Sequence, residues 1–318
     1  MAFRLKLVPD NTQIDFFRWQ WLTFGISAAA MVASVVLILG MGLNFGTSIR
    51  TESPTAIEVG AYRQALNALD LGDVSITEVF DPSFGTEKHV AMVRIGTTNE
   101  TGSVTPEELR TIEAALKAVD PQVAFTSVES VGPKVSGELI LTALYAVGAA
   151  TIGIMFYIWL RFEWQFALGA VVSLVHDVLL TVGIFALFQL RFDLTTIAAL
   201  LTTLGYSVND TVVVFDRLRE NLIKFKTMPL VDVMNRTVNE TLSRTLMTAV
   251  TTALALTAML VFGGDVIRGF VFAMLWGVFV GAYSTVYVAK NIVLWLGVKR
   301  DWGKKDDGPA GTQFASAK

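Results

Sequence analysis

Residues 200–221 read LLTTLGYSVNDTVVVFDRLREN, and most of this stretch is apolar enough to cross a lipid bilayer. Asn209 and Asp210 nevertheless stand next to each other inside it. A carboxylate at membrane depth costs about 2.5–3.5 kcal/mol on insertion scales, so it has to face the interior of a helix bundle, where a partner or water stabilises it. The stretch therefore predicts a membrane-spanning helix that carries a buried, functional carboxyl group.

The composition places the whole chain among membrane proteins. Its mean hydropathy is +0.54. Of the 318 residues, 53% are apolar and only 17% are charged, against about a quarter charged in soluble domains. The net charge is −3 and the basic residues gather beside the apolar runs, which argues against a nucleic-acid partner. With no cysteine and no motif of an ATPase, hydrolase, metal site or cofactor site, we expect a protein that is not an enzyme.

Six apolar runs are long enough to span a bilayer. The first is longer than the apolar part of a signal peptide and no cleavage site follows it, so it is predicted to be retained as an anchor. The sequence thus indicates an α-helical membrane protein whose six transmembrane helices are grouped one plus five. The runs cover residues 21–43, 139–160, 166–190, 194–215, 246–262 and 270–296.

The segment 47–134, between the first two runs, has the patterns of a folded α+β domain. Alternating segments and helical segments follow one another in the order β-α-β-β-α-β, which is the order of the ferredoxin-like fold. A capping-box pattern formed by Thr105, Pro106 and Glu108 predicts the start of the second helix. We therefore expect two helices on one face of a four-stranded antiparallel sheet.

Lysines and arginines in short loops predict the orientation. If the N-terminus is cytoplasmic, the outer short loops keep only Arg191 and Arg268. Both termini are then cytoplasmic and the ferredoxin-like domain is exported. The predicted parts are a cytoplasmic segment 1–18, the first span 19–43, the exported, periplasmic domain 44–135, a five-helix membrane domain 138–298 with a cytoplasmic loop 216–243, and a cytoplasmic tail 299–318.

Depth indicates which polar residues of the spans can meet. Asp210 lies six residues before Asp216, about 9 Å inside the membrane, and Arg244 lies about 6 Å inside the next span. The two side chains are therefore able to pair. A dry carboxylate tends to take up a proton, whereas a nearby arginine favours the charged form. These residues, with Asn209 and the pair His176 and Asp177 near the bilayer centre, form a candidate proton relay.

Structural interpretations compete with this relay. Arg244 can extend from its helix end toward water, and Asn209 with the threonines around 241–252 can serve as hydrogen bonds between helices. His176 and Asp177 can form a satisfied buried pair; adjacent helical residues point about 100° apart, so we do not expect them to face each other. Gly205 can be a close-packing point.

Three segments also carry a resemblance to a known family. ALLTTLGYSVNDTVVVFDRLREN, NETLSRTLMTAVTT and LVHDVLLTVGIF closely resemble the membrane signature of the SecF family of protein-export subunits, which is similar to the resistance-nodulation-division transporters. The resemblance covers the whole topology. It implies that Asp210, in the NDT motif, and Arg244, in the TLxRT motif, are the functional intramembrane charges.

The resemblance also implies partners and a place in the cell. It points to a multi-pass protein of the bacterial inner membrane that works with SecD beside the SecYEG channel, with YajC and YidC as further partners. Such a protein uses protons to help draw unfolded polypeptide across the membrane, and it needs no cofactor. One departure concerns the segment after the first span, because GLNFG (42–46) runs directly into TSIRTES and the family's IDFxGG element is missing.

Two other functions remain open from the sequence. One is a half-size, proton-coupled transporter for a small molecule or lipid, which requires a substrate cavity within the spans. The other is a scaffold that stabilises the export complex without transport of its own. A scaffold should tolerate the change Arg244→Lys, whereas a relay that needs the guanidinium fork should not.

Overall fold

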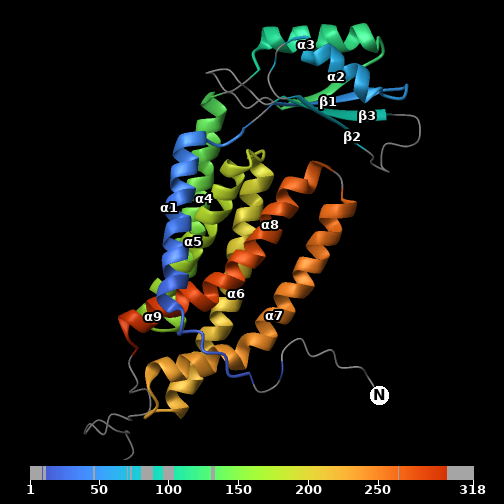
Figure 1. Ribbon diagram of the computed structural model, residues 1–318. Coiled ribbons are helices and arrows are strands. Elements are labelled where there is room, and N and C mark those ends of the chain that lie inside the picture. Colours follow the sequence, from blue (N-terminus) through green and yellow to red (C-terminus); the bar gives the residue numbers. More distant parts are fainter. Residues whose placement is uncertain are drawn as a thin grey trace, which may run out of the picture.

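The computed structural model describes residues 9, 12–45, 47–69, 71, 74–79, 89–95, 104–129, 133–263 and 265–298. A small α+β domain lies at one end of a bundle of long helices (Figure 1). The predicted tail 299–318 and residues 1–8 of the predicted N-terminal segment lie outside the described residues. The described part confirms the predicted fold class, a helical membrane protein with a small antiparallel sheet.

Six helical segments among the described residues are long and apolar enough to cross a membrane. They follow the predicted order, one before the sheet domain and five after it. The last span changes from α to π geometry at Thr285 and returns to α at Lys290. The segments are α1 (Gln20–Met41), α4 (Pro133–Arg161), α5 (Trp164–Leu187), α6 (Leu194–Lys224), α7 (Leu230–Phe262), and α8 (Asp265–Ser284) with η2 (Thr285–Ala289) and α9 (Lys290–Leu296).

The α+β domain has the predicted β-α-β-β-α-β order. Its sheet has the strand order β2-β3-β1-β4 with all pairs antiparallel. Thr105 and Glu108 form the predicted capping box at the start of α3. Both helices cover one face, and the other face is turned toward the bundle (Figure 1). The elements are β1 (Thr47–Ser53), α2 (Val59–Asn67), β2 (Val74–Val79), β3 (His89–Ile95), α3 (Pro106–Val119) and β4 (Ala124–Glu129).

The junction after the first span is held by the bundle. The side chain of Asn44 donates to the carbonyl of Gln189 at 2.8 Å, and its own carbonyl accepts from the amide of Phe192 at 2.8 Å. The rings of Phe45 and Phe192 meet edge to face at 6.0 Å between centroids. The short GLNF segment is therefore tied to the connection between α5 and α6, without the missing family element.

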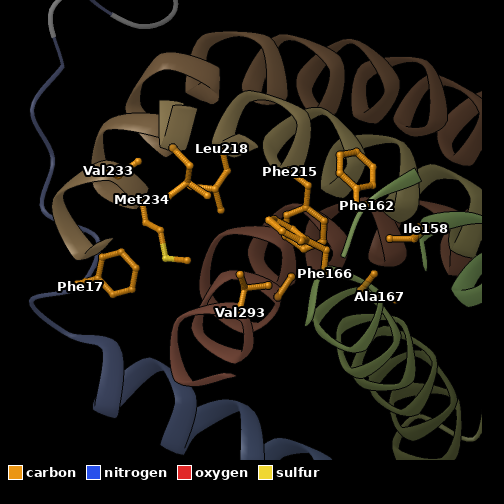
Figure 2. Packing of buried hydrophobic residues seen from close by; sticks show 13 residues of the cluster. Phe17, Ile158, Phe162, Phe166, Ala167, Phe215, Leu218, Val233, Met234 and Val293 are labelled. Carbon is orange, nitrogen blue, oxygen red and sulfur yellow. The ribbon is translucent and has the colours of Figure 1, made fainter. Parts of the chain in front are cut away.

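The predicted cytoplasmic loop 216–243 is almost entirely helical. Helix α6 continues to Lys224 and α7 begins at Leu230, so only residues 225–229 connect them. Hydropathy ends each span where the polar residues begin, but the helices continue because they bury an apolar stripe. Figure 2 shows Leu218, Val233 and Met234 from these extensions packed with aromatic side chains of the bundle.

Helices α5, α6 and α8 form the centre of the bundle. About half of the most apolar part of each of these spans is buried, against 6% for α4 and 11% for α1. Two glycines of α8 bring it close to α6, because Gly277 packs on Thr203 and Gly281 packs on Ser207. Small residues four apart are typical of tight helix contacts in membranes. Polar side chains on α5 and α6 are thereby enclosed by three helices.

Candidate functional site

Asp177 is the centre of a buried polar cluster that joins α5, α6 and α8. The residue is 1% exposed, and its Oδ2 accepts hydrogen bonds from Ser207 Oγ at 2.6 Å and Ser284 Oγ at 2.9 Å. Ser173 Oγ in turn donates to Ser284 Oγ at 2.9 Å. A carboxyl group with this many donors is well stabilised away from water. Asp177 therefore acts as a fixed polar junction between three helices.

The structure corrects the expectation that His176 and Asp177 do not face each other. His176 Nδ1 lies 3.0 Å from Asp177 Oδ1, and both side chains are buried. The imidazole also stacks on the ring of Tyr283, with 6.1 Å between centroids. Its Nε2 is buried and has no hydrogen-bond partner among the described residues. The side-chain torsions close the angle between neighbouring positions, so the interpretation as a buried pair fits better than two separate groups.

Asp210 is buried in a much poorer polar environment. The residue is 4% exposed, and its Oδ1 has one long contact, 3.5 Å from Thr248 Oγ1 on α7. The same hydroxyl lies 3.0 Å from the carbonyl of Thr245, to which its single proton can be donated instead. Asp210 Oδ2 is buried without a hydrogen-bond partner in the part of the chain that the structure describes. This carboxyl group is thus enclosed but hardly stabilised.

Arg244 lies one turn before Thr248, the residue that contacts Asp210, but the structure does not join Arg244 and Asp210 in an ion pair. Between the described residues, ion pairs within 4.0 Å include none of Asp210 with Arg244. Arg244 is exposed and lines a cavity of about 450 Å³ together with Asp216, Arg217 and Glu240. The predicted ion pair is therefore not formed. Arg244 lies one helical turn from the Thr248 contact, and its side chain lines the cavity at the polar end of the bundle.

The remaining predicted polar residues do not join the cluster. Asn209 is exposed on the outside of α6, and Gly205 has open space beside it, so it is not a packing point within this chain. Threonines of α7 donate mostly to carbonyls of their own helix, as Thr241 and Thr251 do. Among the described threonines of α7, Thr248 alone donates to another helix, through its long contact with Asp210. The expected hydrogen bonds between helices are therefore largely bonds within α7.

Further polar residues, which sequence reasoning did not assign, lie near Asp177 and Asp210. Thr211 Oγ1 and Thr285 Oγ1 are 3.0 Å apart, and Ser207 lies one turn from Asp210 on α6. Ser284 and Thr285 stand where α8 passes into the π segment η2. Such π segments are rare and are frequent at functional sites. Serine and threonine are too common in membrane helices to be singled out without the fold.

A buried lysine, Lys290, follows the π segment. It is 1% exposed, and its Nζ lies 3.9 Å from the ring centre of Phe17 and 5.1 Å from that of Phe16. The phenylalanines belong to a segment held on α7, where Asn235 donates to Asp15 at 2.8 Å. This hydrogen bond is the main reason why the pKa of Asp15 is lowered from its ordinary value. The N-terminal residues thus cover the amino group of Lys290 with aromatic rings.

Nothing in the described part of the chain resembles a metal centre, since no group of three or more His, Cys, Asp or Glu side chains could hold an ion there. The site is a set of hydroxyls, the His176 imidazole and two carboxyls inside a helix bundle. Such groups form hydrogen bonds and can transfer protons. A model of the family described as "Protein export membrane protein SecD/SecF, C-terminal" matches residues 111–299, which include all of these groups.

The chain belongs to the SecD/SecF family. Curated relatives named protein translocase subunit SecF are 66% identical in Cereibacter sphaeroides, over 99% of both chains, and 67% identical in Rhodobacter capsulatus, over 96% of both. The protein translocase subunit SecDF of Brucella abortus is 38% identical over 93% of this chain and 39% of its own length. The predicted SecF relationship is confirmed.

Solved structures of SecDF have the same fold. A crystal structure of SecDF, a translocon-associated membrane protein from Thermus, aligns with a TM-score of 0.71 and 30% identity. A super-membrane-facing form of SecDF aligns with a TM-score of 0.65. The chain spans 39% of the length of each SecDF chain and is itself covered to 91% and 90%. It corresponds to the SecF portion of these longer proteins.

Proposed function

We propose that this chain works with SecD as a proton-driven accessory of protein export in the bacterial inner membrane. The observation that carries the proposal is the contrast between its two intramembrane acids. Asp177 has hydrogen-bond donors from two other helices, whereas Asp210 is equally buried with one weak contact. An acid that its surroundings leave unsatisfied is suited to bind and release a proton as the helices around it move.

The route for the proton follows the polar groups on either side of Asp210. Toward the polar end of the bundle lies the cavity that Arg244 lines, and Arg244 is one turn from Thr248 on α7. Toward the centre lies Ser207, which is bonded to Asp177. In the proposed cycle, Asp210 takes a proton from one side and releases it to the other. Arg244 favours the charged form when it approaches.

Movement of α6 and α7 would be transmitted to the sheet domain and change its position. This domain is proposed to lie on the periplasmic side, with both termini in the cytoplasm, in agreement with the distribution of short-loop cations. There it would hold or release an unfolded polypeptide that leaves the SecYEG channel. Its outer strands, β2 and β4, each have one unpaired edge within the described sheet, and such edges can bind an extended chain.

The outer face of α6 supports SecD as the direct partner. Asn209 and Gly205 are exposed there, and an exposed amide at membrane depth is unfavourable in contact with lipid tails. A second subunit on this face would satisfy Asn209 and fill the space beside Gly205. The SecDF relatives, whose name joins both subunits in a single chain, support the same pairing.

Export in inverted membrane vesicles tests the proposal. Asp210→Asn keeps the size and polarity of the side chain but cannot exchange a proton. We expect translocation of a secretory protein to lose its stimulation by the proton gradient, while ATP-driven translocation without a gradient is unchanged. The matched control is Asp232→Asn, the same substitution at an exposed acid of α7, which should respond to the gradient as the wild type does.

The same assay separates the competing functions. A scaffold that only stabilises the complex would give full gradient sensitivity with Asp210→Asn, and this result would refute the proton role. A transporter for a small molecule or lipid would conduct protons while export of the secretory protein is unaffected by any of the variants.

A further inference from the structure

Two phenylalanines that precede the first span lie between α7 and the last span. Phe16 belongs to a buried cluster with Val238 of α7 and Val286 of η2. Phe17 belongs to the cluster of Figure 2, with Met234 of α7 and a valine of α9. Each ring therefore packs against both α7 and the last span, so the two elements have to stay close together for the rings to stay buried.

The main chain beside these rings is held by two asparagines of α7. Asn239 accepts a hydrogen bond from the amide of Ile14 and donates one to the carbonyl of the same residue, both at 2.9 Å. Asn235 accepts from the amide of Phe16 at 3.0 Å. The asparagines are four residues apart and thus lie on the same face of the helix. We call residues 14–17 the latch.

The latch covers the amino group of Lys290. Nζ lies 3.9 Å from the ring centre of Phe17, 5.1 Å from that of Phe16 and 5.6 Å from that of Tyr287. It has no hydrogen-bond partner among the described residues. The carboxyl group of the latch, Asp15, accepts from the amide of Phe17 at 3.0 Å instead. A buried amino group without hydrogen bonds is unfavourable, so the closed latch stabilises the rings at the expense of Lys290.

Water lies close to the bonds that hold the latch. Lys290 is six residues before the end of the last span at Leu296, about 9 Å along the helix axis. At this end of the bundle, a cavity of about 840 Å³ is lined by Ile14, Asn235 and Asn239 together with other, mostly polar, side chains. A polar cavity of this size holds water. The hydrogen bonds between α7 and the latch can therefore be exchanged for hydrogen bonds to water.

We infer that the latch closes over Lys290 in one state of the helix bundle and uncovers its amino group to water in another. Opening exposes two phenylalanine rings, which is unfavourable, but it gives the amino group hydrogen bonds to water, which is favourable. Because the rings pack against both α7 and the last span, separation of these two elements opens the latch.

Helix α7 joins the latch to the acid of the proposed proton cycle, and this link rests on the proposed function. Thr248 of α7 contacts Asp210, and Asn239 stands nine residues earlier on the same helix. The structure combines a closed latch with an Asp210 that forms no ion pair with Arg244. A buried, unpaired carboxyl group is most stable in its neutral form. The neutral form of Asp210 therefore favours the closed latch.

The rate at which Lys290 reacts with a water-soluble amine reagent tests the inference. The purified full-length chain is treated with sulfo-N-hydroxysuccinimide acetate, and mass spectrometry follows acetylation of each lysine. A covered amine reacts only from the open state, so Lys290 should react far more slowly than the exposed Lys224. In Asn235→Ala/Asn239→Ala, Lys290 should react about tenfold faster than in the wild type, because the bonds that hold the latch are lost.

Two further variants make the result specific. Ile14→Pro removes the amide that Asn239 accepts from and leaves α7 unchanged. It should accelerate the reaction of Lys290 as well, and it protects the test if the asparagine variant does not fold. Gln13→Ala is the matched control, since it removes an exposed amide directly before the latch. It should leave the rate at Lys290 as in the wild type.

The link to the proton cycle has its own measurement. Asp210→Asn keeps the side chain neutral, so Lys290 should react more slowly in this variant than in the wild type. An unchanged rate would overturn the link. Failure of the proton role would be seen separately, as full gradient stimulation of export in Asp210→Asn, and would leave the rates of the latch variants as the test of the latch itself.

Three outcomes would overturn the latch. The first is a wild-type Lys290 that reacts as fast as Lys224. The second is a rate at Lys290 that neither Ile14→Pro nor the asparagine variant raises. The third is an equal acceleration by Gln13→Ala, which would show that any change in this segment exposes the lysine.

Discussion

At the scale of single residues, the two buried acids differ in what surrounds them. The sequence predicted that Asp210 is buried inside the bundle, and the residue is 4% exposed; an isolated carboxyl in an apolar run is a strong signal of this kind. It could not predict that Asp177 is bonded by serines of α6 and α8, because those serines are ordinary until the helices pack. The approach of Arg244 without an ion pair was also beyond the sequence, since side-chain direction decides it.

The bond from Ser207 to Asp177 gives a prediction for stability. Ser207→Ala leaves one carboxyl oxygen without its shortest hydrogen bond, at 2.6 Å, in a buried place. We expect the free energy of unfolding to fall by about 1–3 kcal/mol, the cost of leaving a buried polar group without its hydrogen bond. Titration with a denaturing detergent measures it.

Thr202→Ala is the matched control for Ser207→Ala. Thr202 is exposed on α6 and donates to the carbonyl of Ala198 in its own helix. Its loss should change the free energy of unfolding by less than about 0.5 kcal/mol. Equal changes in the free energy of unfolding would show that the hydrogen bond from Ser207 to Asp177 contributes no more to stability than the exposed hydrogen bond of Thr202.

At the scale of elements, periodicity and hydropathy predicted the strands and the six spans well. The segment 216–243, predicted as a loop between two spans, is largely helical, because two helices continue there as an amphipathic pair. Ion pairs such as Arg217 with Glu240 at 2.7 Å, and the buried stripe of Figure 2, stabilise this pair. A hydropathy pattern shows where a helix leaves the membrane and not where it ends. The π segment at 285–289 has no sequence signal that we could use.

Two glycines allow a test of how closely α8 packs on α6. A side chain at Gly277 would clash with Thr203, whereas one at Gly205 would meet open space. We expect Gly277→Leu to separate α8 from α6 and to lower the free energy of unfolding by about 1–3 kcal/mol, the usual cost of overpacking. Gly205→Leu should not destabilise the isolated chain. A Gly277→Leu variant as stable as the wild type would contradict the close approach of the two helices.

At the scale of the whole molecule, the fold class followed from the order of apolar and alternating segments. The position of the sheet relative to the bundle did not, because it depends on contacts between residues far apart in sequence. Residues 12–18 show the same limit: they were predicted only as part of a cytoplasmic segment, but Phe16 and Phe17 cover Lys290. The position of the sheet and the burial of Lys290 therefore result from tertiary packing, which the sequence of a single strand or helix does not predict.

The most direct test of the proton role is proton flux through vesicles that contain this chain together with SecD. A pH-sensitive dye inside the vesicles reports flux after an imposed gradient. We expect Asp210→Asn to reduce flux to the rate of vesicles without protein, while Asp232→Asn conducts as the wild type does. Flux at the wild-type rate in Asp210→Asn would contradict it.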